Sequence, residues 1–111
     1  MDKLKIKEAI VVEGRDDTAA VQKAADALII ETHGFGISRE TWKLLTKAYE
    51  EKGLIIMTDP DFSGEEIRKR ISEKFPQSKH VYMPRKKAEK GNDIGIENAA
   101  PEDIALSLIH I

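Results

Sequence analysis

Two short apolar segments that end directly in acidic residues constrain the fold of this chain more than any other feature. Residues 54–58 (LIIMT) run into the acids Asp59 and Asp61, and residues 9–12 (AIVV) run into Glu13. Short runs rich in β-branched residues are typical of buried strands. In open α/β sheets, ligands bind outside the carboxyl ends of the strands. The three acids can therefore meet at one edge of a sheet if the two strands are neighbours.

Pro60 stands between the two aspartates of the second segment. Alternate side chains of an extended backbone share a face, and proline fixes its own φ and donates no ladder hydrogen bond, so Asp59 and Asp61 can point the same way. Such a pair suits Mg²⁺, which proteins hold with one or two carboxylates, water and substrate phosphate. The same residues also suit a turn that caps the next helix, so both interpretations stay open. Gly14 lets the backbone turn sharply beside Glu13.

Four short β-type segments alternate with helical ones along the chain. The predicted strands cover residues 6–13, 28–32, 54–58 and 79–83. Helices are expected to follow from about Asp16, Ser38, Ser63 and Pro101. This order predicts an α/β fold with a central, mainly parallel sheet of four strands, and the almost continuous apolar strands predict helices on both of its faces. At 111 residues we expect one domain, residues 1–111, around a single core.

The third predicted helix carries signals at its start and along one face. Ile67, Ile71 and Phe75 repeat every four residues, which is typical of a helix packed on a core. Ser63 and Glu66 have the spacing of a capping box, in which each side chain satisfies a backbone group of the first turn. The amides and positive dipole end of this helix are expected beside the acids, where they can hold an anion or be capped by Ser63.

The composition limits the kinds of site and substrate. The chain has no cysteine, which excludes disulfides and thiolate zinc sites and favours the reducing cytoplasm as its compartment. No apolar run is long enough for a transmembrane helix. The 18 basic and 20 acidic residues give a net charge of −2, so no overall basic field attracts nucleic acid. A bound Mg²⁺ would reverse the sign of the acidic edge, so the composition still allows a nucleic-acid substrate.

A polar segment, residues 84–95, follows the fourth predicted strand and shows neither helical nor strand periodicity, which predicts a loop. Arg85, Lys86 and Lys87 in this loop are candidates for contacts with a phosphate backbone, although such residues also serve as ordinary solvated surface. Gly34 ends the second strand on the same edge as the acids, which makes it a candidate for contact with substrate.

Aromatic residues are few, with one Trp, two Tyr and three Phe. Trp42 has helical spacing with Leu45 and Tyr49, which is more typical of a packed side chain than of a stacking site. We therefore expect no extended platform for stacking bases. The histidines share no spacing of metal ligands, so we expect ordinary structural roles for them.

The order of these features resembles the Toprim domain, which topoisomerases, bacterial primases, recombination mediators and certain nucleases share. Within that family the sequence is most similar to ribonuclease M5, which matures 5S ribosomal RNA. Five stretches carry the resemblance: residues 6–18, 30–32, 58–62, 64–69 and 95–99. A Glu-Gly pair or an Asp-x-Asp motif alone is a weak signal, but here both occur in order, each after an apolar strand.

The resemblance implies a Toprim fold with a site for Mg²⁺ or Mn²⁺, and it assigns Glu13, Asp59 and Asp61 as metal ligands and catalytic acids. In a nuclease of this kind, one or two ions polarise the scissile phosphate and lower the pKa of the attacking water. Glu13 is either a ligand or the group that transfers a proton. The implied substrate is RNA, in particular a 5S rRNA precursor, and the implied partner is a ribosomal protein that binds 5S RNA.

Three further acids lie in or near the matching stretches. Asp16 and Asp17 either orient Glu13 or place negative charge at the first turn of their helix. Glu97 follows the basic loop and is either a supplementary acid at the site or ordinary surface.

Two functions stay open at this point. The first is Mg²⁺-dependent endonucleolytic hydrolysis of RNA, with the basic loop holding backbone phosphate. The second is a non-catalytic module that binds nucleic acid or protein through the same fold. The maturation ribonucleases carry an RNA-binding domain after the Toprim domain, whereas this sequence stops at Ile111. We therefore expect either a catalytic portion of such an enzyme or a stand-alone small Toprim protein.

Overall fold

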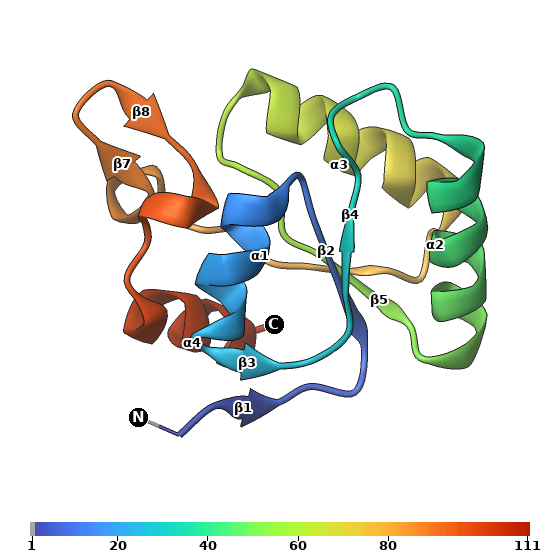
Figure 1. Ribbon diagram of the computed structural model, residues 1–111, viewed down its shortest axis with the longest axis horizontal. Coiled ribbons are helices and arrows are strands. Elements are labelled where there is room, and N and C mark those ends of the chain that lie inside the picture. The colour runs from blue at the N-terminus through green and yellow to red at the C-terminus, as the bar shows by residue number, and fades with distance from the viewer. Residues whose placement is uncertain (1) are drawn as a thin grey trace.

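A parallel sheet of four strands forms the centre of the molecule (Figure 1). The computed structural model describes residues 2–111. The strands lie in the order β4 (Ile29–Glu31), β2 (Ala9–Val12), β5 (Leu54–Ile56) and β6 (Lys79–His80). Since β2 and β5 are hydrogen-bonded neighbours, the two strands that end in acids lie side by side at the centre of the sheet.

Helices cover both faces of this sheet (Figure 1). One face carries α1 (Arg15–Gln22) and α4 (Pro101–Ile109), and the other carries α2 (Arg39–Glu51) and α3 (Phe62–Lys74). Successive residues of β2 enter two separate cores, because Ile10 and Val12 pack with α1 and α4 whereas Val11 packs with α2 and α3. Burial on both sides explains the apolar strands and confirms the predicted α/β fold. None of the helices in residues 2–111 is both long and apolar enough to cross a membrane.

A second, smaller sheet accounts for the most visible difference from the predicted strands. β1 (Leu4–Lys5) pairs in parallel with β3 (Ala25–Asp26), outside the central sheet. The predicted strand over residues 6–13 is therefore too long, since only its central part forms β2. Strands of two residues give no sequence period, so these short elements have no signal in the residue pattern.

Residues 84–95 contain regular structure, so the prediction of an irregular loop is wrong. They form a short 3₁₀ helix, η1 (Arg85–Lys87), and an antiparallel hairpin of β7 (Glu89–Lys90) and β8 (Asp93–Ile94), and η2 (Ile96–Asn98) follows. Gly91 makes the hairpin turn with a φ of 62°, a conformation that favours glycine. Buried Ala88 and Ile96 anchor the two ends of the hairpin to the core.

Asp61, rather than Ser63, caps α3, so the predicted capping box is wrong. The backbone of Asp61 is extended, and its Oδ1 accepts a hydrogen bond of 2.7 Å from the amide of Gly64. Aspartate caps a helix as well as serine does, and Asp61 comes earlier in the chain. The helix therefore begins at Phe62, and Ser63 lies within its first turn.

Gly64 allows the start of α3 to approach the segment that precedes it. A Cβ atom at this position would overlap the carbonyl oxygen of Asp59 and would lie 2.9 Å from the Asp59 amide nitrogen. These are backbone atoms that cannot swing aside, so only glycine fits. The contact fixes the path of the chain from Asp59 to Asp61.

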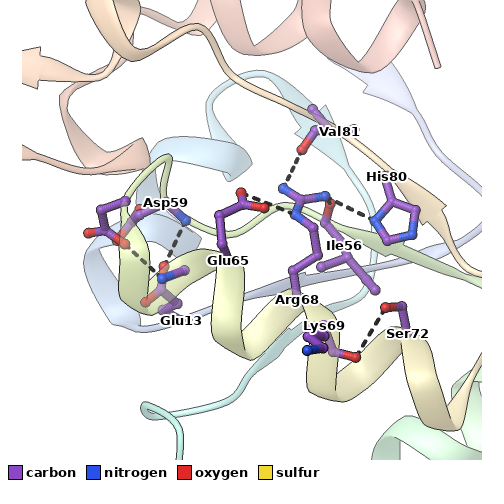
Figure 2. Close-up of polar contacts among 11 residues, drawn as sticks. Glu13, Ile56, Asp59, Glu65, Arg68, Lys69, Ser72, His80 and Val81 are labelled. Carbon is purple, nitrogen blue, oxygen red and sulfur yellow. Dashed lines mark hydrogen bonds and ion pairs between the residues drawn. The ribbon is translucent and has the colours of Figure 1, made fainter.

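Arg68 ties α3 to the ends of β5 and β6 (Figure 2). The buried guanidinium donates from Nη1 to the carbonyl of Ile56 at 3.1 Å and from Nη2 to the carbonyl of Val81 at 2.7 Å. Nη1 also lies 3.1 Å from Nδ1 of His80. The guanidinium carbon is 4.1 Å from the centroid of the Tyr82 ring, a cation–π contact. Burial lowers the pKa of Arg68, yet arginine stays charged in proteins, so these contacts compensate a buried cation.

We expect Arg68→Met to lower the free energy of unfolding by about 3 kcal/mol, because each hydrogen bond to a charged group contributes about 1.5–3 kcal/mol. Urea unfolding followed by circular dichroism measures this change. Lys69→Met is the matched control, since Lys69 is exposed on the same helix and is expected to change stability by less than about 0.5 kcal/mol. Equal stabilities of the two variants would contradict the structural role of Arg68.

We expect Gly64→Ala to lower the free energy of unfolding by about 2 kcal/mol or more, since the added methyl group must displace the backbone of Asp59. The same unfolding measurement applies. Gly36→Ala is the control, because a Cβ atom at Gly36 has no heavy atom within 4 Å. A wild-type stability for Gly64→Ala would show that the backbone at the start of α3 can move away from Asp59 more easily than the structure indicates.

Candidate metal centre and active site

The parallel register of β2 and β5 brings Glu13 next to Asp59. Val11 pairs with Ile56, and the amide of Met57 donates to the carbonyl of Val11 at 2.9 Å, which extends the pairing toward the carboxyl ends. Oε2 of Glu13 then accepts a hydrogen bond of 2.7 Å from the amide of Asp59 (Figure 2). The two acids are 46 positions apart in the sequence, and the sheet alone brings them together.

Asp17 completes a group of three carboxylates. It lies in the first turn of α1 and is only 6% exposed, and its Oδ2 accepts a hydrogen bond of 3.1 Å from the amide of Gly14, the N-cap residue. One carboxylate oxygen from each of Glu13, Asp17 and Asp59 lies within 4.8 Å of the other two. Converging carboxylate oxygens are the ligands that hard divalent cations prefer.

A backbone amide from another part of the chain also fixes Asp59. Its Oδ1 accepts a hydrogen bond of 2.8 Å from the amide of Ile96, the first residue of η2. The segment that follows the β7–β8 hairpin thus closes over the carboxyl ends of β2 and β5. No sequence signal links Ile96 to Asp59, because a backbone amide carries no residue-type preference.

Asp61 lies outside this group of three. One of its oxygens is committed to the cap of α3, as described above, so its carboxylate turns toward the helix. Asp16 is exposed on the first turn of α1, whereas Asp17 is buried. A signal for Asp17 does exist in the sequence: it stands three positions after Gly14, which is the spacing at which a side chain reaches back to an N-cap amide.

Burial raises the pKa of two of the three clustered acids. Desolvation raises the pKa of Asp59 to about 7, and the Glu13 and Asp61 carboxylates add to the shift. Desolvation, with the neighbouring charge of Asp59, raises the pKa of Asp17 to about 6. Among residues 2–111, no lysine or arginine pairs with Glu13, Asp17 or Asp59. The group thus has the oxygen donors and the uncompensated negative charge that a divalent cation requires.

The remaining predicted acid and the predicted basic side chains lie on η2 and η1. Glu97 lies on η2 and its side chain is largely exposed. Partial desolvation and the neighbouring Asp93 and Asp17 carboxylates together raise its pKa. The side chains of η1 are exposed, with an ion pair of 3.1 Å between Arg85 and Glu89 and one of 3.8 Å between Lys87 and Asp103. Exposed pairs of this kind stabilise the fold little and exchange readily with other anions.

Two cavities lie along the sheet, and one of them adjoins the acid cluster. The larger, of about 510 Å³, lies between β4 and α2 and contains none of the three clustered acids. The smaller, of about 430 Å³, is lined by Glu13 and Gly34 together with Phe35, Phe62 and other residues of α3. Glu13 therefore faces both the acid cluster and an open pocket, and Gly34 lies on the wall of that pocket.

We expect Asp17→Asn to stabilise the protein in EDTA above pH 6, by about 2–3 kcal/mol. The raised pKa means that the folded wild type binds more protons than the unfolded chain, so wild-type stability falls as pH rises from about 4 to 6. Asparagine keeps the oxygen that accepts from Gly14 but carries no charge. Unfolding of both proteins between pH 4 and pH 8 measures the difference, which should vanish near pH 4.

The exposed neighbour provides the control for this experiment. Asp16→Asn removes the same charge one position earlier on an exposed side chain, so it should not produce the stabilisation that Asp17→Asn produces above pH 6. A pH-independent difference between the wild type and Asp17→Asn would contradict the burial of an ionisable carboxylate at this position.

Comparisons with known proteins agree with this fold. The Toprim domain family model matches residues 8–89. A small TOPRIM domain protein from Bacillus stearothermophilus superimposes with a TM-score of 0.75 at 25% sequence identity, covering 99% of this chain and 90% of that one.

Curated relatives of higher identity carry the name Ribonuclease M5. The protein from Fusobacterium nucleatum is 50% identical over 107 residues, which cover 96% of this chain and 58% of the relative. The protein from Clostridium botulinum is 48% identical over 103 residues, which cover 93% of this chain and 57% of the relative. This chain thus spans less than two thirds of the length of these relatives. On the family model, which matches most of its length, the chain belongs to the Toprim domain family.

Proposed function

We propose that this protein is a Mg²⁺-dependent endonuclease that hydrolyses phosphodiester bonds in RNA. The convergence of Glu13, Asp17 and Asp59 at the carboxyl ends of two central strands is the observation that carries the proposal. Relatives at 46–50% identity that are named Ribonuclease M5 support RNA as the substrate. A 5S rRNA precursor is the specific substrate that we propose, with a ribosomal protein that binds 5S RNA as its partner and the cytoplasm as its compartment.

The proposed ligands of the cation are Glu13, Asp17 and Asp59. Bound Mg²⁺ would polarise the scissile phosphate and lower the pKa of the attacking water. Backbone amides hold all three carboxylates in place, since Glu13 accepts from the Asp59 amide, Asp59 from the Ile96 amide and Asp17 from the Gly14 amide. Such fixed ligands cost little reorganisation when the cation arrives.

Asp61 has a second role in this proposal. Its Oδ1 caps α3, while its Oδ2 has no hydrogen-bond partner within residues 2–111. The free oxygen is available to a second cation or to the water shell of the first. Its negative charge also adds to the field at Asp59, as the raised pKa of Asp59 shows.

The exposed side chains of Arg85, Lys86 and Lys87 on η1 are the proposed contacts with RNA backbone phosphate. They precede the β7–β8 hairpin in the chain, and the segment after that hairpin contacts Asp59 through the Ile96 amide. Contacts of this kind position a backbone without selecting a sequence. We further propose that residues 1–111 act as one Toprim domain that supplies the chemistry.

Cleavage of end-labelled, double-stranded 5S precursor RNA in Mg²⁺ or Mn²⁺ tests this function. We expect the wild type to cut, and we expect Glu13→Gln and Asp59→Asn each to lower the rate by about 100-fold or more, because each removes a charge that holds the cation. Asp16→Asn is the matched control and should cut like the wild type. Full activity of either cluster variant would contradict the proposed site.

The second candidate function is a module that binds nucleic acid or protein without cutting; the match to a small TOPRIM domain protein, of which this chain covers 90%, is a likeness to a protein of similar size. The same experiment separates the two. Saturable RNA binding in EDTA, with no cleavage of RNA or matched DNA in either cation, would favour the binding module.

A further inference from the structure

The pocket of about 430 Å³ beside the acid cluster is lined by aromatic side chains that do not pack in the hydrophobic core. Phe62 is 81% exposed and Phe35 is 55% exposed, and both line this pocket together with Glu13. The third phenylalanine, Phe75, is 3% exposed and packs in the core, as this residue type usually does. Two of three phenylalanines thus face solvent at the place where the proposed chemistry occurs.

Contacts with Arg70 hold Phe35 in place, and the helix start fixes the backbone of Phe62. The carbonyl of Phe35 accepts hydrogen bonds from Nη1 of Arg70 at 3.0 Å and from the amide of Ile37 at 2.9 Å. The guanidinium of Arg70 also lies over the Phe35 ring, 4.7 Å from its centroid. Phe62 is the first residue of α3, directly after the Asp61 cap. One aromatic wall is therefore held in its loop by Arg70 of α3, and the other stands on the first residue of the same helix.

The side chains that line the pocket favour an uncharged occupant over a phosphate group. Its polar side chains are Glu13, Ser63 and Glu66, and no lysine or arginine lines it. The carboxylate of Glu66 is half-buried and makes no hydrogen bond or ion pair within residues 2–111. An occupant that suits these walls is planar and uncharged, and it offers N–H donors at one edge.

A nucleobase meets all of these requirements. Bases stack on aromatic side chains, and each stacked base contributes about 1–3 kcal/mol to binding. Guanine presents two adjacent N–H donors, N1 and N2, on its Watson–Crick edge, which is the arrangement that a carboxylate accepts with both oxygens. Uracil presents a single N–H between two carbonyl oxygens, and these oxygens would face the Glu66 carboxylate.

We propose that this pocket binds one unstacked nucleobase, preferentially guanine, from the nucleotide next to the scissile phosphate. Phe35 and Phe62 form its aromatic walls, and Glu66 accepts the N–H groups of the base. The inference rests on the proposed nuclease function and narrows its substrate class: the nucleotide next to the cut must leave the base stack. Enzymes that read an extruded base do so by stacking and by contacts to its Watson–Crick edge.

Binding of nucleotides tests the pocket without any cleavage. We would titrate the protein with guanosine 5′-monophosphate and with uridine 5′-monophosphate in Mg²⁺ and follow the ring signals of the three phenylalanines by NMR. We expect the guanine nucleotide to shift Phe35 and Phe62 while the buried Phe75 stays unchanged. Glu66→Gln should weaken guanosine monophosphate binding by about 10-fold and leave the weaker uridine monophosphate binding unchanged.

Variants of Phe62 test, by their effect on RNA cleavage, whether the wall of the pocket must be aromatic. We expect Phe62→Ala to raise the RNA KM by about 5- to 100-fold, Phe62→Tyr to keep the wild-type value, and Phe62→Leu to behave like alanine, because leucine is apolar but does not stack. Leu44→Ala is the control, since Leu44 is 57% exposed on α2 and does not line this pocket.

The outcomes separate this inference from the nuclease proposal. Cleavage that depends on Asp59, combined with unshifted phenylalanine signals and normal KM values for Phe62→Ala, would overturn the base pocket and leave the nuclease standing. Shifted signals without cleavage would support the pocket and contradict the nuclease. A wild-type KM for Phe62→Leu, or self-association of the wild type that Phe62→Ala abolishes, would assign the patch to apolar contact and overturn the stacking role.

Discussion

The parallel pairing of β2 with β5 is the constraint on which the rest of this structure depends. Because Val11 lies opposite Ile56, both strands end at the same edge, and the residues that follow them, Glu13 and Asp59, meet there. The strands can be central only if both faces are apolar, which in turn requires helices on both sides. The register between β2 and β5 therefore determines both the fold and the position of the site.

The acid cluster opposes the stability of the fold that carries it. Burial raises the pKa values of Asp17 and Asp59, so at neutral pH the folded protein holds charges that the unfolded chain would solvate better. A divalent cation would relieve this repulsion. Backbone amides and the glycine contact at Gly64 keep the carboxylates in place until then. Tight packing around the site thus offsets the cost of its charges.

The fold and part of the site were predictable from the sequence, and the reasons differ by residue. The apolar runs before Glu13 and Asp59 give the strands and their acidic ends, so the α/β fold follows from local pattern. The roles of Asp61 and Asp17 were harder to predict, because both acids lie near a helix start: the spacing from Gly14 explains why Asp17 accepts an N-cap amide, but only the folded structure shows that Asp17 joins the cluster and Asp61 does not. The base pocket had no sequence signal, since exposure of Phe35 and Phe62 is a property of the folded surface.

Anomalous scattering of Mn²⁺ in crystals of the protein would show whether Glu13, Asp17 and Asp59 form a divalent-metal site. We predict an anomalous peak within coordinating distance of one oxygen from each of Glu13, Asp17 and Asp59. A peak bound by Asp59 and Asp61 with Asp17 turned away, or no peak at this edge of the sheet at millimolar Mn²⁺, would contradict the account.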